Sequence, residues 1–153
     1  WPWPRAKGNP VHRHKSLSYA ENMAARRMAA GAGAFDALFT NLRGHVAEGT
    51  ATNVFLVERG RLVTPPLDEG LLPGVTRKHL LAIAARIGVG VRERPFGVAR
   101  LCAADEAFVA NSLAEVVPVS RVEGRRIAPP GPLTRTLAQA YHAEVLAAIE
   151  EGR

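Results

Sequence analysis

The sequence predicts a mixed α/β fold with a curved or barrel-like sheet. Short segments rich in Val and Phe recur along the chain and are separated by turn residues, a pattern typical of strands. Two longer stretches, 76–87 and 132–149, instead carry apolar residues at helical spacing. The chain has 153 residues, of which 47% are hydrophobic and 22% are charged, so one domain with a substantial core is expected.

The N-terminal part of the chain is expected to hold an extended segment followed by a helix. Residues 1–13 are basic and rich in proline, so we expect a linker or arm rather than a packed element. An Ala-rich helix follows over 20–30. Met23, Ala24 and Met28 are the candidates for its buried face.

The rest of the chain is expected to alternate strands with hairpins and helices. Arg59-Gly60 is a tight hairpin turn, and Pro118 implies an edge strand or a bulge. We expect strands at 37–40, 53–57, 61–64, 89–93, 106–110 and 116–119, a helical turn at 98–103, a hairpin at 122–127, and helices at 76–87 and 132–149. The apolar stripe of the last helix consists of Leu133, Leu137, Tyr141, Val145 and Ile149.

Charge and cysteine content narrow the possible function classes. The net charge is +6, but the basic residues are mostly scattered Arg. Attraction of an anionic substrate therefore explains the charge as well as nucleic-acid binding does. The single cysteine, Cys102, excludes an intrachain disulfide framework and fits a reducing cytoplasm. No apolar run has transmembrane length, no signal peptide is evident, and none of the five histidines has metal-ligand spacing, so we assign no metal.

Residues 71–77, which lead into a predicted helix, form a candidate phosphate site. Gly74 permits a turn that residues with a Cβ resist, and Thr76 offers a hydroxyl and an N-cap. The helix that follows would direct its free N–H groups at an anion. An ordinary helix start after a Pro-Gly turn would carry the same residues, so this segment alone does not decide the function.

Three further places could carry chemistry. Lys15 would need a desolvated site to attack a carbonyl, and Tyr19, four residues on, could place a phenol close to it. Glu48 precedes small and hydroxyl residues and could pair with a pyridinium nitrogen. Asn111 and Ser112 follow a buried-type strand and could form a second anion site with neighbouring amides. A solvated lysine, a surface glutamate and an ordinary Asn-Ser turn are the simpler alternatives.

Taken in order, four stretches resemble the class IV (fold type IV) pyridoxal-phosphate aminotransferases, which include branched-chain and D-amino-acid aminotransferases and 4-amino-4-deoxychorismate lyase. The stretches are 14–22, 47–55, 71–77 and 111–119. The resemblance implies that residues 14–153 form the C-terminal pseudo-barrel domain of a D-amino-acid-aminotransferase-like enzyme. It also implies pyridoxal 5'-phosphate as cofactor, an amine or amino acid as substrate, and a cytoplasmic homodimer without nucleic-acid or membrane partners.

The resemblance implies a role for each matching residue. Lys15 would bind the cofactor covalently and shuttle protons, and Glu48 would pair with the pyridine nitrogen. Tyr19 would lie near the ring hydroxyl, and Leu72 would pack on the ring. The residues on the phosphate side would be Gly74, Val75, Thr76, Asn111 and Ser112. The residues near the substrate carboxylate would be Leu113 and Ala114.

The chain begins where the resemblance places an interdomain linker. We therefore expect that residues 1–13 are this linker and that the N-terminal domain of the family is absent from the chain. Because that domain carries a phosphate-binding arginine and much of the substrate pocket, we expect weak cofactor binding or none, and no turnover, from residues 1–153 alone.

Within the family, the chain looks most like 4-amino-4-deoxychorismate lyase, which eliminates pyruvate to give 4-aminobenzoate, a folate precursor. The basis is the run at 15–22 and the Asn111-Ser112-Leu113 loop, where branched-chain enzymes usually carry Gly-Thr-Ala. A branched-chain or D-amino-acid aminotransferase is the alternative. A basic non-enzymatic binding module is a further alternative, but it leaves the four ordered motifs unexplained.

Overall fold

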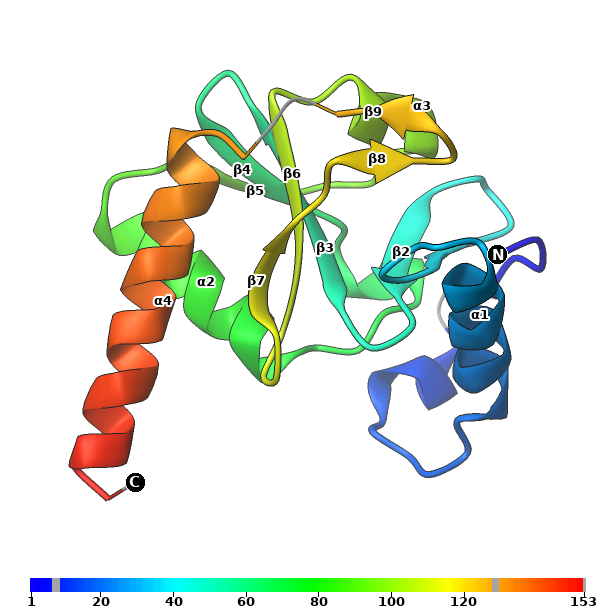
Figure 1. Ribbon diagram of the computed structural model, residues 1–153, viewed down its shortest axis with the longest axis horizontal. Helices are drawn as coiled ribbons and strands as arrows, with labels where there is room; N and C mark the ends of the chain where they lie inside the picture. The colour runs from blue at the N-terminus through cyan, green and yellow to red at the C-terminus, as the bar shows by residue number, and fades with distance from the viewer. Residues whose placement is uncertain (7–8, 128–129, 153) are drawn as a thin grey trace.

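A five-stranded sheet forms the centre of the computed structural model, which describes residues 1–6, 9–127 and 130–152 (Figure 1). Its strands are β3 (Asn53–Glu58), β4 (Arg61–Thr64), β5 (Val91–Glu93), β6 (Glu106–Asn111) and β7 (Glu115–Pro118). The strand order is β5-β4-β3-β6-β7. All neighbours are antiparallel except β4 and β5, which are parallel. Pro118 therefore lies on an edge strand, where its missing N–H costs no ladder bond, as predicted.

The two central strands, β3 and β6, are covered on both faces. Because side chains alternate across a strand, Val54 and Leu56 of β3 enter one apolar core cluster. Phe55 points to the opposite cluster and stacks on Phe108 of β6, with ring centroids 4.7 Å apart. Burial on both faces explains why these strands are continuous apolar runs rather than alternating ones. The structure confirms the expected mixed α/β fold.

Smaller elements complete the architecture. The remaining strands are β1 (Leu38–Thr40), β2 (Val46–Gly49), β8 (Arg121–Val122) and β9 (Arg125–Arg126). The helices are η1 (Pro10–Arg13), α1 (Ala20–Gly31), η2 (Leu67–Glu69), α2 (Val75–Arg86), α3 (Val98–Cys102) and α4 (Pro132–Glu150). In Figure 1, α2 and α4 cover one side of the central sheet, whereas α1 and the β1–β2 ladder lie on the other side of the molecule. No helix in the described part of the chain is both long enough and apolar enough to span a membrane.

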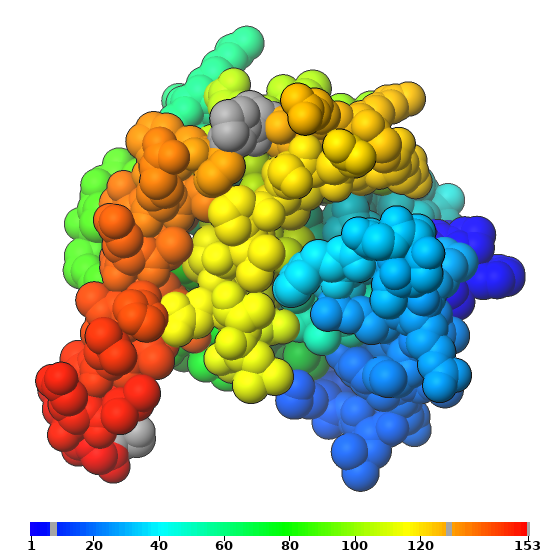
Figure 2. All heavy atoms as spheres, in the orientation of Figure 1, coloured from blue at the N-terminus to red at the C-terminus, as the bar shows by residue number. Residues whose placement is uncertain are grey.

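The apolar stripe of α4 is buried only in its first half. Leu137 and Tyr141 enter the core cluster beneath α2 and α4, but Ile149 is 66% exposed. Figure 2 shows why, because the C-terminal end of α4 (red) projects beyond the body of the molecule. The predicted stripe therefore describes the packed half of the helix and not its free end.

The predicted buried face of α1 is wrong. Met23 and Met28 are 55% and 47% exposed, and Ala24 is exposed as well. The buried residues are Ala25 and Ala29, which pack with Phe39 of β1 in a small cluster. Their small side chains let the helix approach the β1–β2 ladder closely, so the larger apolar residues face outward. 

The prediction that residues 1–13 do not pack holds only in part. Most of the described residues of this segment are exposed, but Trp1 and Arg5 contact the fold; Lys7 and Gly8 lie outside the described residues. The Trp1 ring lies 6.1 Å from that of Phe39. Arg5 is 4% exposed and forms a β-bridge with Asn41. Residues Pro10–Arg13 form the helix η1. Whether the segment connects two domains stays a prediction.

Candidate active site

Two segments, 48–53 and 71–76, lie side by side at one edge of the fold. The Leu72 N–H donates to Glu48 Oε2 at 3.0 Å, and the Leu72 carbonyl accepts from Asn53 Nδ2 at 2.9 Å. Glu48 is on β2 and Asn53 begins β3, so the neighbouring strands hold the Leu72 backbone from two directions. Segment 71–76 is therefore fixed against the β2–β3 connection.

Glu48 is a buried carboxylate with donors on both oxygens. It is 8% exposed, and its Oε1 accepts from Arg5 Nη1 at 2.5 Å. Burial raises the pKa of Glu48, because removal of water disfavours the charged form. The Leu72 N–H and the Arg5 guanidinium oppose that rise. A buried carboxylate with a shifted pKa and a specific charge partner is a candidate functional group.

Tyr19 is connected to the same place through Thr50. The Tyr19 hydroxyl and Asn22 Nδ2 both donate to the Thr50 carbonyl at 2.6 Å. Burial and the nearby Glu48 charge raise the pKa of Tyr19, so the phenol stays protonated. The structure therefore brings Tyr19 and Glu48 together. Lys15 lies in the irregular segment before α1, exposed and without a hydrogen bond or ion pair to any described residue, so its role stays a prediction.

Thr76 lies at the other end of the 71–76 segment. Its hydroxyl is 3.0 Å from Tyr141 Oη of α4 and 3.4 Å from Ser112 Oγ. The predicted N-cap role of Thr76 is wrong, because α2 begins at Val75 and Gly74 is its N-cap, with no side-chain capping bond. The first N–H groups of α2 thus have neither an intrahelical partner nor a side-chain cap.

Gly74 is needed for close packing rather than for its backbone conformation. Its φ and ψ are −62° and 141°, which any residue can adopt, so the predicted need for a special turn is wrong. A Cβ at this position would instead lie 2.1 Å from Asn53 Oδ1. The glycine therefore allows segment 71–76 to reach the start of β3.

The 111–114 loop docks on the same β2–β3 connection. Asn111 Nδ2 donates to the Ala51 carbonyl at 3.1 Å. Asn111 Oδ1 accepts from the N–H groups of Leu113 and Ala114 at 2.9 and 2.7 Å. Amides next to Ser112 were predicted to help form an anion site, but these two N–H groups are already hydrogen-bonded within the loop. The Ser112 hydroxyl remains directed at Thr76, and Leu113 is 97% exposed.

Sequence reasoning missed three supporting residues. Arg5 gave no signal within a Pro-rich segment, and Tyr141 was assigned only to a packing stripe. Asp36 was not singled out, yet its Oδ1 accepts from Thr50 N–H at 3.0 Å and its Oδ2 accepts from the Thr52 hydroxyl at 2.8 Å. These contacts hold the connection to which Tyr19 is bonded. Within the described residues, no three His, Cys, Asp or Glu side chains are grouped as metal ligands.

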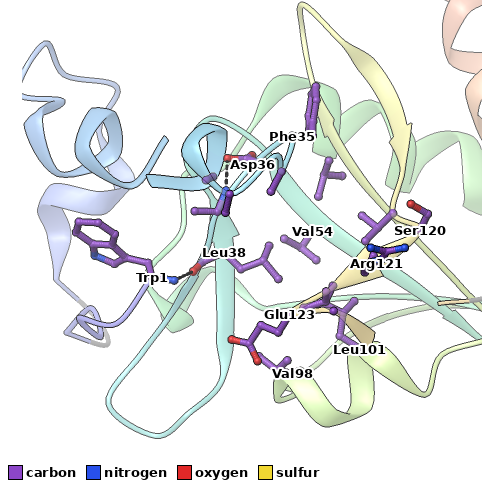
Figure 3. Close-up of a pocket in the computed structure, with 18 of the residues that line it drawn as sticks. Trp1, Phe35, Asp36, Leu38, Val54, Val98, Leu101, Ser120, Arg121 and Glu123 are labelled. Atoms are coloured by element: carbon purple, nitrogen blue, oxygen red, sulfur yellow. Dashed lines mark hydrogen bonds between the residues drawn. The ribbon is translucent and has the colours of Figure 1, made fainter. Parts of the chain in front are cut away.

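A large hollow lies elsewhere in the described part of the structure. It has a volume of about 960 Å³ and is lined mainly by apolar residues, among them Phe35, Leu38, Val54 and Val98 (Figure 3). None of the predicted site residues lines it. The hydroxyl and carboxylate groups described above carry the chemistry, so we place the candidate site along segments 48–53 and 71–76.

Comparison with known proteins identifies relatives of this arrangement. The sequence model of the family described as amino-transferase class IV matches residues 2–122. A Thermotoga maritima protein, provisionally assigned as a branched-chain-amino-acid aminotransferase, is 40% identical over 114 residues, which is 73% of this chain and 42% of that protein. This chain spans about half the length of the curated relatives it matches.

Solved structures show the same fold. The branched-chain amino acid aminotransferase of Thermobaculum terrenum, in its PLP-bound holo form, has a TM-score of 0.87 at 35% identity and covers 94% of this chain and 48% of its own. A Legionella pneumophila protein, provisionally assigned as a 4-amino-4-deoxychorismate lyase, has a TM-score of 0.90 at 34% identity. The match covers 94% of this chain and 53% of the Legionella chain.

Proposed function

Because the chain belongs to the class IV aminotransferases, which are pyridoxal-phosphate-dependent enzymes, we propose that it carries the cofactor-binding part of an aminotransferase that acts on amino acids. Lys15 is the residue that we propose to bind the cofactor covalently. One observation carries the proposal. A single fixed segment, 71–76, has a buried carboxylate at one end and a hydroxyl-rich, uncapped helix start at the other.

The chemistry of these groups fits the two ends of pyridoxal phosphate. The start of α2 has no acidic residue in its first turn and no side-chain cap, so its N–H groups and the Thr76 and Ser112 hydroxyls suit a phosphate dianion. Glu48 suits the pyridine nitrogen, because it is ionisable, buried and already oriented by two donors. Leu72 lies between the two ends and is half-buried, as a residue that packs on a ring should be.

When bound, the cofactor supplies a conjugated ring that takes up the electron pair released when a substrate C–H bond breaks. We assign Lys15 to accept the proton from that carbon. Glu48 holds a proton on the ring nitrogen, and Tyr19 orients the ring from the Thr50 side. Ser112 and Thr76 fix the phosphate, and the exposed Leu113 and the half-buried Ala114 border the space left for substrate.

Transamination is the main proposal, and it revises the interpretation drawn from sequence alone, which placed the lyase first. Relatives assigned as branched-chain aminotransferases support transamination. The lyase remains a second candidate because of the Legionella structure and the Asn111-Ser112-Leu113 loop. We also propose that the active form is a homodimer, as in the family that the sequence resembles.

The test compares two reactions catalysed by the complete translation product of the gene. Amino-group transfer from branched-chain amino acids to 2-oxoglutarate is expected, with little pyruvate release from 4-amino-4-deoxychorismate. Lys15→Ala should abolish transfer. Lys78→Ala is the matched control, because Lys78 is exposed and lies two residues beyond Thr76, on the opposite side of α2. If pyruvate release were instead the dominant reaction, the lyase would be the function and transamination would be rejected. Full activity of Lys15→Ala would contradict both.

A further inference from the structure

Arg5 is a buried cation that is fixed to the fold independently of its charge partners. Its N–H donates to the Thr40 carbonyl at 2.8 Å, and its carbonyl accepts from Leu42 N–H at 3.2 Å. Its guanidinium carbon lies 3.6 Å from the centre of the Phe39 ring. The backbone bonds and the ring stacking hold Arg5 against β1, and only 4% of the residue is exposed.

Strand register places this cation beside Glu48. Phe39 and Glu48 are direct partners in the β1–β2 ladder, so their side chains share one face. Arg5, stacked on Phe39, donates from Nη1 to Glu48 Oε1 at 2.5 Å, while Leu72 N–H occupies Oε2. A carboxylate offers about four acceptor positions, so room remains for one more N–H donor.

The same guanidinium is connected to Tyr19 through one side chain. Arg5 Nη2 donates to Asn22 Oδ1 at 3.1 Å, and Asn22 Nδ2 donates to the Thr50 carbonyl that also binds the Tyr19 hydroxyl. One cation therefore orients the carboxylate directly and the phenol indirectly. The Asn22 contact also satisfies a second N–H group of the buried guanidinium.

We propose that Arg5 is a positioning residue that keeps Glu48 ionised, so that the carboxylate holds a proton on the pyridine nitrogen of the cofactor. This inference rests on the proposed function. A carboxylate buried without a cation would itself take up the proton. The guanidinium makes the carboxylate a weaker base, so the shared proton stays on the nitrogen, and a protonated ring is the stronger acceptor of electrons.

Other charged groups near Glu48 do not replace Arg5. Asp36 carries a charge of the same sign and raises the pKa of Glu48. Glu21 lies 3.7 Å from Arg5 Nε and is about two-fifths exposed, so it competes only weakly for the guanidinium. Of the described groups that act on Glu48, Arg5 is therefore the one that supplies positive charge.

The test uses two spectroscopic measurements on the folded chain. Carboxyl ¹³C NMR follows the titration of Glu48 without cofactor, and ¹⁵N NMR of labelled pyridoxal phosphate reports whether the ring nitrogen is protonated. Arg5→Gln should move the Glu48 titration midpoint upward and abolish the protonated-nitrogen signal. Arg5→Lys should keep that signal. The matched control, Arg27→Gln, changes an exposed arginine of α1 and should alter neither measurement.

The outcomes separate the inference from the proposed function. If the complete translation product shows no cofactor attached to Lys15 after borohydride reduction, the proposed function fails, and the cofactor-free titration still decides whether Arg5 controls Glu48. If the cofactor binds and Arg5→Gln retains a protonated ring nitrogen, the inference fails alone. If Arg5→Gln does not fold, the wild-type titration decides: Glu48 found protonated at neutral pH would overturn the inference.

Discussion

At the scale of single residues, burial and hydrogen bonding have opposite effects on the pKa of Glu48. Burial raises its pKa, whereas Leu72 N–H and Arg5 lower it. The net effect is upward, so the folded chain binds a proton more tightly than the unfolded chain, whose reference pKa is 4.5. The contribution of Glu48 to the free energy of unfolding is therefore fully present below about pH 4.5. It is lost as the pH rises through the pKa of Glu48 in the folded chain.

This balance predicts a specific pH dependence. Glu48→Gln cannot ionise, so it should remove the part of the stability loss that wild type shows as the pH rises from 4.5 through the raised pKa. Chemical denaturation of both proteins across this pH range measures the difference between their unfolding free energies. A difference that stays constant with pH would show that Glu48 has an ordinary pKa in the folded chain.

Gly74 provides a second test at the same scale. Gly74→Ala should destabilise the chain by about 1–3 kcal/mol, because the new Cβ must displace Asn53 and segment 71–76. Gly31→Ala is the matched control, since no atom lies within 4 Å of a Cβ there and the residue ends helix α1. Its stability should change by less than about 1 kcal/mol. Equal unfolding free energies for the two variants would refute the packing argument.

At the scale of elements, local sequence predicts what a segment forms better than which side it buries. Strands β3, β4 and β6 were predicted within one residue at each end, because their β-branched and aromatic runs are unambiguous. β2 was missed as a strand, since Glu48 and Gly49 interrupt its apolar pattern. The buried face of α1 was wrong because alanines, rather than methionines, meet Phe39.

The start of α4 is held by hydrogen bonds to Glu106, a residue of strand β6. Glu106 of β6 accepts from the N–H groups of Leu133 and Thr134, at 3.1 and 2.7 Å, and so caps the start of this helix. Glu106→Ala should cost about 1–3 kcal/mol, because it leaves one buried and one partly buried donor without an acceptor. Glu150→Ala, at the exposed end of α4, is the control and should be near neutral. Thermal unfolding of both variants tests this cap. Equal unfolding temperatures for the two variants would show that Glu106 does not stabilise the start of α4.

At the scale of the whole molecule, β3 and β6 join the two core clusters into one unit. Leu101 lies in the cluster on one side of the sheet and Leu80 in the cluster beneath α2 and α4. Leu101→Ala and Leu80→Ala should each cost about 2–5 kcal/mol and should shift the same single unfolding transition. Two separate transitions in calorimetry would mean that the clusters fold independently.

The site could be predicted only where its residues lie within short motifs. The motif residues Glu48, Leu72 and Thr76 occupy adjoining positions in the structure, as their order in the chain suggested. Arg5 lies 43 residues from Glu48, and Tyr141 lies 65 residues from Thr76. Neither contact has a signal in local sequence, because each depends on how distant elements pack.

The central claim is that this chain binds pyridoxal phosphate through Lys15, and one measurement tests it directly. The chain contains three lysines, Lys7, Lys15 and Lys78. The complete translation product is incubated with pyridoxal phosphate and reduced with borohydride, and peptide mass mapping then reports which of these three lysines carries the cofactor. We predict one pyridoxyl group on Lys15, reduced several-fold in Glu48→Gln and in Thr76→Ala. Equal labelling of Lys15 and Lys78 would contradict the account. So would labelling of Lys15 that is the same in wild type, Glu48→Gln and Thr76→Ala.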